Sequence, residues 1–441
     1  MAKSAHSASY HLLNTDPRLL TAEQEQKVLI TDEDLAIQEN EPADKSSLWK
    51  AMVNLITAIE GTGLLGLPYV IAQSGLVAVA GLVAIPFIAY YTGTILVDCL
   101  YDNDDAGERV RVRSNYKELG KACSPRFGGI IVGAVQLIEL FLLASLYLVL
   151  CASLSSSTFP ELLLSQKVWM VIAAAVGLPA IFVKNLSQVA WMSLLSVIAL
   201  LVAVVAVLAY GIAHHSAWVP SDILVWDIEG VPVALAIIIF SYICHPILPV
   251  VEASMKDKSQ FRAMLTLSFI AVAILKVGFS VCAFLSFSSN IQDVIVNSLP
   301  MGILRRIVNG VLIVNVLFSY PFLVISIIQT IEESVSAESF SFKIPDIVWF
   351  IGIRVFTNFL TLLPAISIPH FALFMAFVGS LTASFVSFIL PAVFHLILKK
   401  KELRLYHYIL DVSVIIFGIL ASILGLVFTG KSLYETMFRH S

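Results

Sequence analysis

Long, nearly unbroken apolar runs dominate this chain from residue 48 onward. About 20 apolar residues cross a bilayer as a helix, whereas membrane β-barrels show short alternating segments. The pattern therefore predicts an all-α polytopic membrane protein, with the transmembrane domain at 48–430 and a short lumenal C-terminus at 431–441. The eleven predicted helices are 48–75, 77–100, 128–153, 168–183, 189–213, 232–253, 263–288, 303–331, 346–363, 368–397 and 405–430.

Composition narrows the class of function. Of the 441 residues, 58% are hydrophobic and 13% are charged, whereas soluble domains carry about 25% charged residues. With 27 Lys and Arg against 31 Asp and Glu, no basic excess exists to bind nucleic acid. The sequence has no metal-type cluster, phosphate loop or supported Ser-His-Asp pattern, so neither an enzyme nor a bound cofactor or metal is predicted.

Residues 1–47 differ from the rest. They hold nine acidic and four basic residues and few aromatic ones, which is typical of a disordered tail. The tail contains Glu25, Leu29 and Ile30 in the spacing of an acidic-dileucine signal, which favours binding to vesicle sorting adaptors. Such six-residue patterns also occur by chance.

The connections between the predicted helices give the orientation. With the N-terminus in the cytosol, the inside connections hold fifteen Lys and Arg residues and the opposite side holds five. Cytoplasmic loops carry the excess of basic residues. We therefore expect 1–47 to be a cytoplasmic tail and the C-terminus to lie in the lumen or outside.

Two predicted helices carry breaking residues. The first has three glycines and a proline within eight residues, and the sixth has two prolines three residues apart, namely Gly61, Gly63, Gly66 and Pro68, then Pro246 and Pro249. Backbone groups freed in a bilayer must line a cavity or meet a ligand. A glycine-lined packing face and an ordinary proline kink are the structural alternatives.

Breaks in the first and sixth helices suggest two repeats of five helices, with the eleventh helix added. Such inverted repeats bind substrate where the two broken helices meet. Free N–H groups suit a carboxylate and freed carbonyls suit an ammonium group, so an amino acid is the expected substrate. The predicted binding residues at the breaks are Glu60, Gly61, Thr62, Gly63, Phe240, Ser241 and Tyr242.

Several motifs resemble the amino acid/auxin permease family, and most of all its vesicular inhibitory amino acid branch. The similarity extends over roughly 47–430 and rests on Gly61–Tyr69, Tyr91–Tyr101, Val110–Arg113, Ala122–Phe127, Ile237–Tyr242, Ser319–Pro321, Ile368–Leu373, Gly379–Thr382 and Leu390–Pro391. It implies a leucine-transporter-type fold and exchange of lumenal protons for cytosolic GABA or glycine. Glu60, Thr62, Gly63 and 244–246 depart from that branch, so the resemblance defines the class better than the substrate.

Ionisable residues inside apolar helices need a reason, because a charge at the bilayer centre costs about 2.5–3.5 kcal/mol or more. Glu60, Glu139 and His245 are the candidate proton-coupling residues, since each can change its charge. A structural ion pair, for example Glu139 with Lys276, and a hydrogen-bonded histidine are the alternatives. Tyr147, Ser319 and Tyr320 are candidates for closing the binding pocket, or for aromatic packing.

The hypothesis from sequence is a secondary transporter that loads a small neutral amino acid, GABA or glycine first, into acidic synaptic or endolysosomal vesicles. A proton gradient drives it, with chloride or sodium as further ions left open. Two alternatives stay open as well: a lysosomal or plasma-membrane symporter coupled to protons or sodium, and an amino-acid sensor that signals through its tail.

Overall fold

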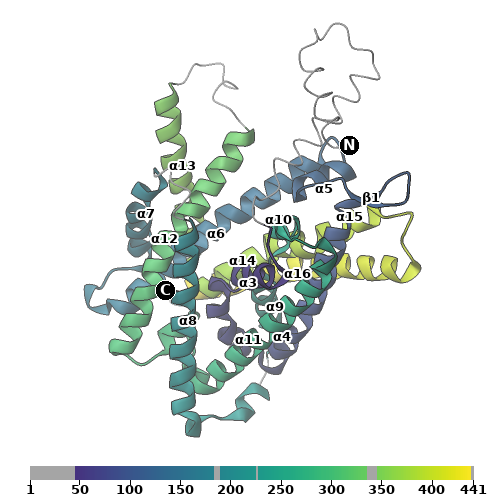
Figure 1. The fold of residues 1–441 in the computed structure, drawn as a ribbon. Coiled ribbons are helices and arrows are strands. Elements are labelled where there is room, and N and C mark those ends of the chain that lie inside the picture. Colours follow the sequence, from purple (N-terminus) through teal and green to yellow (C-terminus); the bar gives the residue numbers. More distant parts are fainter. Residues whose placement is uncertain (1–44, 183–188, 225–226, 335–344, 439–441) are drawn as a thin grey trace.

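The computed structural model describes residues 45–182, 189–224, 227–334 and 345–438. The sorting pattern at Glu25, Leu29 and Ile30 lies outside these residues and stays a prediction. The described chain is built of helices (Figure 1). The helices of 16 residues or more are α4 (Leu67–Asp98), α6 (Gly128–Thr158), α7 (Gln166–Ile181), α8 (Val189–Ala213), α11 (Phe261–Phe287), α12 (Ile303–Ser334), α13 (Asp346–Ser367) and α16 (Leu405–Phe438).

Two regions of the chain form helices only in pieces. The first consists of α3 (Leu48–Ile59), the 3-10 turn η2 (Thr62–Gly66) and the start of α4. The second consists of α9 (Val231–Ser241), the 3-10 turn η7 (His245–Ile247) and α10 (Leu248–Ser254). Glycines favour the first interruption, and Pro246 and Pro249 lack the N–H groups that would continue α9. The interruptions therefore fall where the sequence placed them.

The number of membrane crossings remains a prediction. Among the described residues, nine helical segments are long and apolar enough to cross a membrane, and Leu48–Ile59 and Gln166–Ile181 are shorter apolar helices. One of the nine, Thr62–Asp98, contains Gly75 with φ 53° and ψ −130°, a conformation outside the helix. Glycine adopts positive φ without steric cost, so the chain turns at Gly75 between the first two predicted spans.

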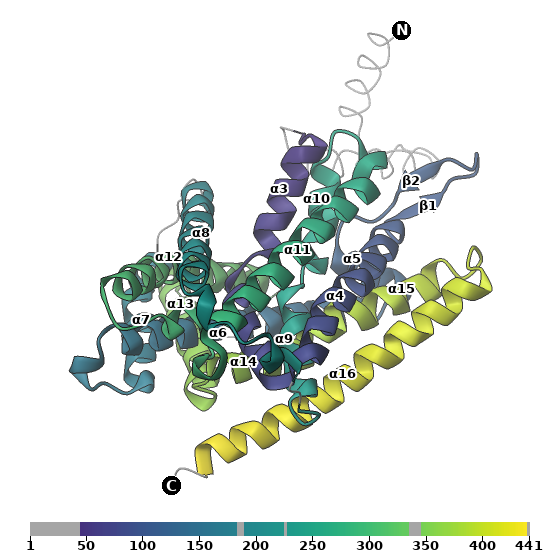
Figure 2. The same ribbon diagram turned by 90° about the horizontal axis from the view of Figure 1, so that it is seen from below.

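The interrupted helices lie inside the bundle. α9 packs against α4, α16 and α14 (Phe371–Val378), and α11 packs against α3 and α4. After α14 come two π-helical segments, Gly379–Ala383 and Phe385–Ile389, and then α15 (Leu390–Leu398). Figure 2 shows α16 as a long helix along one edge of the molecule, with α9 and α11 further inside.

One end of the bundle carries a small β-hairpin, and we call this end the hairpin side. β1 (Tyr101–Asn103) pairs antiparallel with β2 (Arg109–Arg111), and α5 (Tyr116–Cys123) follows. The N–H of Ser46 donates to the carbonyl of Ser254 at 2.6 Å, and the N–H of Lys256 donates to the carbonyl of Ser46 at 2.9 Å. The start of α3 and the end of α10 are thereby joined at the hairpin side.

Candidate functional site

The two interruptions meet. A Cβ added to Gly63 would lie 3.2 Å from the Cα of Ser241, so a side chain at position 63 would press on the backbone of the second interruption. Phe240 also lies beside Gly63. The structure thus brings the predicted segment Glu60–Gly63 against the predicted segment Phe240–Tyr242. We call this meeting region the seam. It consists of Ile59–Gly63, Phe240–Tyr242 and Lys276.

Lys276 of α11 enters the seam and is fully buried. Its Nζ donates to the carbonyl of Ser241 and, at 3.4 Å, to the carbonyl of Ile59. The same nitrogen lies 4.5 Å from the centre of the Tyr242 ring, a cation–π distance. Because Ile59 and Ser241 end α3 and α9, one ammonium group satisfies carbonyls that both helices leave free.

Glu60 is the residue at which α3 ends. Both of its carboxyl oxygens are buried and have no hydrogen-bond partner in the described part of the chain. Its electrostatic partner is Lys276. A buried carboxyl without hydrogen bonds is costly as an anion, so a proton or a nearby cation stabilises it. The place of Glu60 in proton coupling and substrate binding stays a prediction.

The polar side chains of the second interruption are used within the protein. The Ser241 hydroxyl donates to the carbonyl of Ile238 at 2.8 Å, and the Tyr242 hydroxyl donates to the carbonyl of Leu82 at 3.0 Å. Their backbone groups, rather than their hydroxyls, are therefore the part of these residues that a ligand in the seam would meet.

Lys276 does not pair with Glu139. Glu139 is half-buried on α6 and makes no ion pair or hydrogen bond among the described residues. Its electrostatic neighbour is Tyr116 of α5. The suggested structural pair is thus wrong, because the seam carbonyls take the lysine. The place of Glu139 in proton coupling stays a prediction.

His245 is fully buried next to α4, with Nε2 at 2.9 Å from the Thr92 hydroxyl. With that hydroxyl donating to the carbonyl of Ile88 at 2.9 Å, we assign the proton to Nε2, which then donates to Thr92. Nδ1 has no partner in the residues described. This geometry suits a neutral imidazole, and coupling through His245 stays a prediction.

Ser319 and Tyr320 bond to helices away from the seam. The Tyr320 hydroxyl donates to Asn358 at 2.8 Å and lies 2.7 Å from the Thr361 hydroxyl, both on α13. Ser319 lies 3.2 Å from the Ser196 hydroxyl of α8. Tyr147 is half-buried and packs against the core. These contacts match the packing alternative, and a closing role for the three residues stays a prediction.

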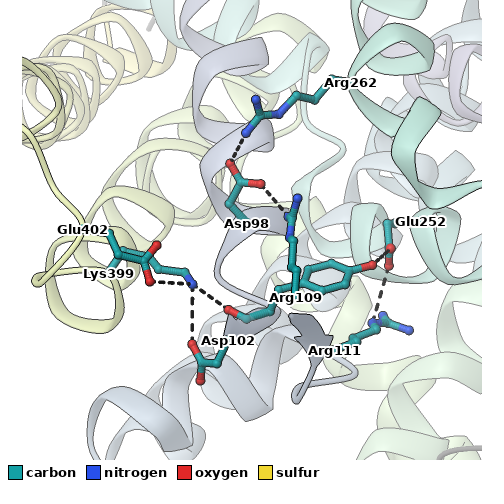
Figure 3. A network of polar contacts seen from close by, with 9 residues as sticks. Asp98, Asp102, Arg109, Arg111, Glu252, Arg262, Lys399 and Glu402 are labelled. Atoms are coloured by element: carbon teal, nitrogen blue, oxygen red, sulfur yellow. Dashed lines mark hydrogen bonds and ion pairs between the residues drawn. The ribbon is translucent and has the colours of Figure 1, made fainter. Parts of the chain in front are cut away.

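Sequence reasoning missed a network of charges on the hairpin side (Figure 3). Asp98 accepts from Arg109 and Arg262, each at 2.7 Å. Arg113 pairs with Asp102 at 2.7 Å, and Lys399 donates to the carbonyl of Tyr101 at 2.7 Å. We call it the hairpin network, and its members are Asp98, Tyr101, Asp102, Arg109, Arg111, Arg113, Glu252, Arg262, Lys399 and Glu402.

The centre of the hairpin network is buried. Glu252 of α10 is 1% exposed, accepts from the Tyr101 hydroxyl and lies 3.4 Å from Nε of Arg111. Burial, with this hydrogen bond, raises the pKa of Tyr101 above its usual range. The network joins α4, the hairpin, α10, α11 and the end of α15, so these elements separate only if its ion pairs break.

A second buried polar group fastens the eleventh predicted helix. Asp411 of α16 is fully buried, accepts from the Tyr91 hydroxyl at 2.6 Å and lies 2.7 Å from Nδ1 of His395. Tyr91 and His395 line a cavity of 520 Å³ beside the hairpin network. Helix α16 is thus bonded to α4 and α15 through side chains.

The opposite side has a half-buried acid. Asp293, between α11 and α12, accepts from the N–H groups of Phe371 at 3.0 Å and Val294 at 2.9 Å, and so caps α14. Burial raises its pKa, although those two hydrogen bonds and His370 oppose the rise. This carboxyl therefore takes up a proton more readily than an exposed aspartate.

Comparison with known proteins gives the family. The family described as "Transmembrane amino acid transporter protein" matches residues 44–430. The chain belongs to the transmembrane amino acid transporter family. The vesicular inhibitory amino acid transporter of Xenopus tropicalis is 36% identical over 404 residues, which is 89% of this chain and 78% of that protein. The vesicular GABA transporter of Caenorhabditis elegans is 32% identical over 429 residues, covering 95% and 87% of the two chains.

The fold of this family member agrees with a solved transporter. MhsT in complex with L-phenylalanine superposes with a TM-score of 0.51 at 12% sequence identity, over 88% of this chain and all of MhsT. At that identity the likeness concerns the fold alone. It confirms the leucine-transporter-type fold and, with the family, the resemblance found in the sequence. The chain is a multi-pass membrane protein for amino acid transport.

Proposed function

We propose that this chain loads a small neutral amino acid into acidic vesicles in exchange for protons, with GABA or glycine as the first candidates. The observation that carries the proposal is the buried carboxyl of Glu60, which accepts no hydrogen bond from the described residues, at the meeting point of the two interrupted helices. The names of the vesicular relatives support the direction of transport and the choice of substrate.

The proposed exchange uses Glu60 for two cations in turn. As an anion it holds the ammonium group of the substrate, while N–H groups at Gly61–Gly63 meet the carboxylate. A proton arriving from the acidic compartment neutralises Glu60 and releases the ammonium group there. The emptied, protonated carrier returns and loses its proton on the less acidic side, so protons and substrate move in opposite directions.

In this cycle the hairpin network closes one entrance to the seam. We propose that the hairpin side faces the cytosol, in agreement with the excess of Lys and Arg in its connections. The ion pairs of Asp98, Glu252 and Lys399 then keep the cytosolic entrance closed in the described conformation. Substrate enters when these pairs open.

The test is uptake of labelled amino acids into proteoliposomes whose pH difference and voltage are clamped separately. An acidic interior is expected to drive accumulation of GABA or glycine by the wild-type protein, and E60Q is expected to abolish the pH-driven part. E161Q is the matched control, because Glu161 lies on the exposed opposite side beside Arg306. The proposal fails if no amino acid accumulates in response to the pH gradient.

A further inference from the structure

The position of Lys276 bears on which cation can be coupled to transport. Its ammonium group is fully buried, and every polar contact that it makes among the described residues belongs to the two interruptions. It lies on neither interrupted helix but on α11. A third helix therefore places one positive charge between the ends of α3 and α9.

Two helix ends point their negative poles at this charge. The last carbonyls of a helix have no intrahelical partner and carry about half a negative charge in total. Ile59 ends α3 and Ser241 ends α9, and the carbonyls of both accept from Nζ of Lys276. Carbonyls freed in this way at membrane depth are the ligands that bind sodium in transporters with broken helices.

With Glu60 and Lys276 both ionised, the charge in the seam is balanced. Glu60 contributes one carboxyl and Lys276 contributes one ammonium group, and the two interact electrostatically. A sodium ion entering the same place would compete with Lys276 for both carbonyls and would leave an uncompensated positive charge in a medium of low dielectric constant. The seam thus has the oxygen ligands for a monovalent metal ion, and the protein's own cation occupies them.

We propose that Lys276 is a resident cation, which takes the place of a coupled metal ion in the seam. The wild-type protein then binds no sodium there, and the proton on Glu60 is the only cation that changes during the cycle. The last statement rests on the proposed function, whereas the occupation of the carbonyls by Lys276 does not. Removal of the ammonium group exposes two carbonyls beside a carboxylate, so it should create a sodium site.

The experiment measures the thermal unfolding midpoint of the purified full chain in detergent. Sodium is varied, and choline keeps the ionic strength constant. The wild type is expected to show no saturable change, whereas K276Q gains a saturable rise of about 2 °C or more in sodium. K276R keeps a cation in place and is expected to show no response. K399Q is the matched control, because Lys399 is also a buried lysine on a backbone carbonyl, but outside the seam.

Two outcomes overturn the proposal: a saturable sodium response of the wild type, or a folded K276Q variant that does not respond. If K276Q does not fold, the wild type and K276R provide the test. A saturable sodium response of the unfolding midpoint in either of them contradicts a resident cation. Replacing sodium by choline in proteoliposomes is a second measurement, expected to change the uptake rate less than about 2-fold. Because unfolding needs no substrate, a failed transport assay would remove the proposed function and leave the assignment of Lys276 standing.

Discussion

The seam and the hairpin network both join helices through charge, but they do so under opposite conditions. Lys276 is 0% exposed, and its ammonium group donates to the carbonyls of Ile59 and Ser241. In the hairpin network the Asp98 side chain is 24% exposed, and it is shared by two arginines that are 53% and 62% exposed. The seam has one ammonium group and one carboxyl, both buried, whereas the network has several ion pairs with exposed members.

This difference predicts how each region responds to substitution. Removing one partner of a buried charge pair leaves an uncompensated charge and costs about 3–5 kcal/mol. An exposed ion pair contributes about 0–1 kcal/mol, and salt screens it. A single substitution in the seam should therefore cause most of the loss of stability that the region can show. Each substitution in the network should remove only part of its stabilisation. This suits the proposed closure, because a closure has to open in every transport cycle.

The largest effect is expected in the seam. K276M leaves the Glu60 carboxyl without its positive partner and should lower the free energy of unfolding by about 3–5 kcal/mol. The double variant E60Q/K276M removes both charges and should recover more than half of that loss. Denaturant unfolding in detergent measures both values. If the double variant is as unstable as the two single losses added together, Glu60 and Lys276 are not a charge pair.

The next effect is expected at the buried centre of the network. E252Q weakens the contacts to Tyr101 and Arg111 and should favour opening of the hairpin side by about 1.4 kcal/mol. Cys99 is fully buried and follows the end of α4, just before β1. Its alkylation by a membrane-impermeant maleimide should therefore become about 10-fold faster. E108Q, on the exposed hairpin turn, is the control and should leave the alkylation rate unchanged. If Cys99 reacts no faster in E252Q than in the wild type, the network does not close the hairpin side.

A smaller effect is expected at the exposed rim of the network. R262A removes one of the two arginines on Asp98 and should speed alkylation of Cys99 by no more than about 5-fold, since the pair contributes under about 1 kcal/mol. The difference from wild type should shrink in high salt. An effect larger than that of E252Q, or one that salt does not reduce, would show that burial does not determine how much each ion pair contributes to closure.

The smallest effect concerns pH on the opposite side. Burial raises the pKa of Asp293 in the folded protein, so the folded state binds this proton more readily than the unfolded state. Stability from this group therefore increases as pH falls through the folded-state pKa and is lost as pH rises. Lowering the pH from 7 toward about 4, close to the ordinary aspartate pKa of 3.8, should raise the unfolding midpoint of the wild type relative to D293N by about 1–2 °C. D227N, in an exposed loop, is the control. Parallel curves for wild type and D293N would exclude Asp293 as the titrating group.

The sequence predicted the fold class and the interruptions because their causes are local. Gly61, Gly63 and Pro246 act on their own stretch of backbone, and apolar runs show helices without knowledge of their neighbours. The partners of Lys276 are 35 and 217 residues away. A lysine in an apolar run indicates that a partner exists, but not which helix supplies it.

The hairpin network was missed for a similar reason. From the sequence we interpreted Arg109, Arg111 and Arg113 only as loop charges that indicate the orientation of the protein in the membrane. Their alternate spacing puts them on one face of an extended strand, and this signal could have predicted β2. The acids that they bind come from α4, β1 and α10, and only the packed structure shows that these elements meet.

The contacts of Lys276 also bear on the order in which the chain is made. Its acceptors at Ile59 and Ser241, and the carboxyl of Glu60, all precede it in the sequence. Chains are synthesised from the N-terminus, and earlier parts can fold first. When α11 leaves the ribosome, the groups that compensate its lysine have already been translated, so this helix never has to wait in lipid for a later partner.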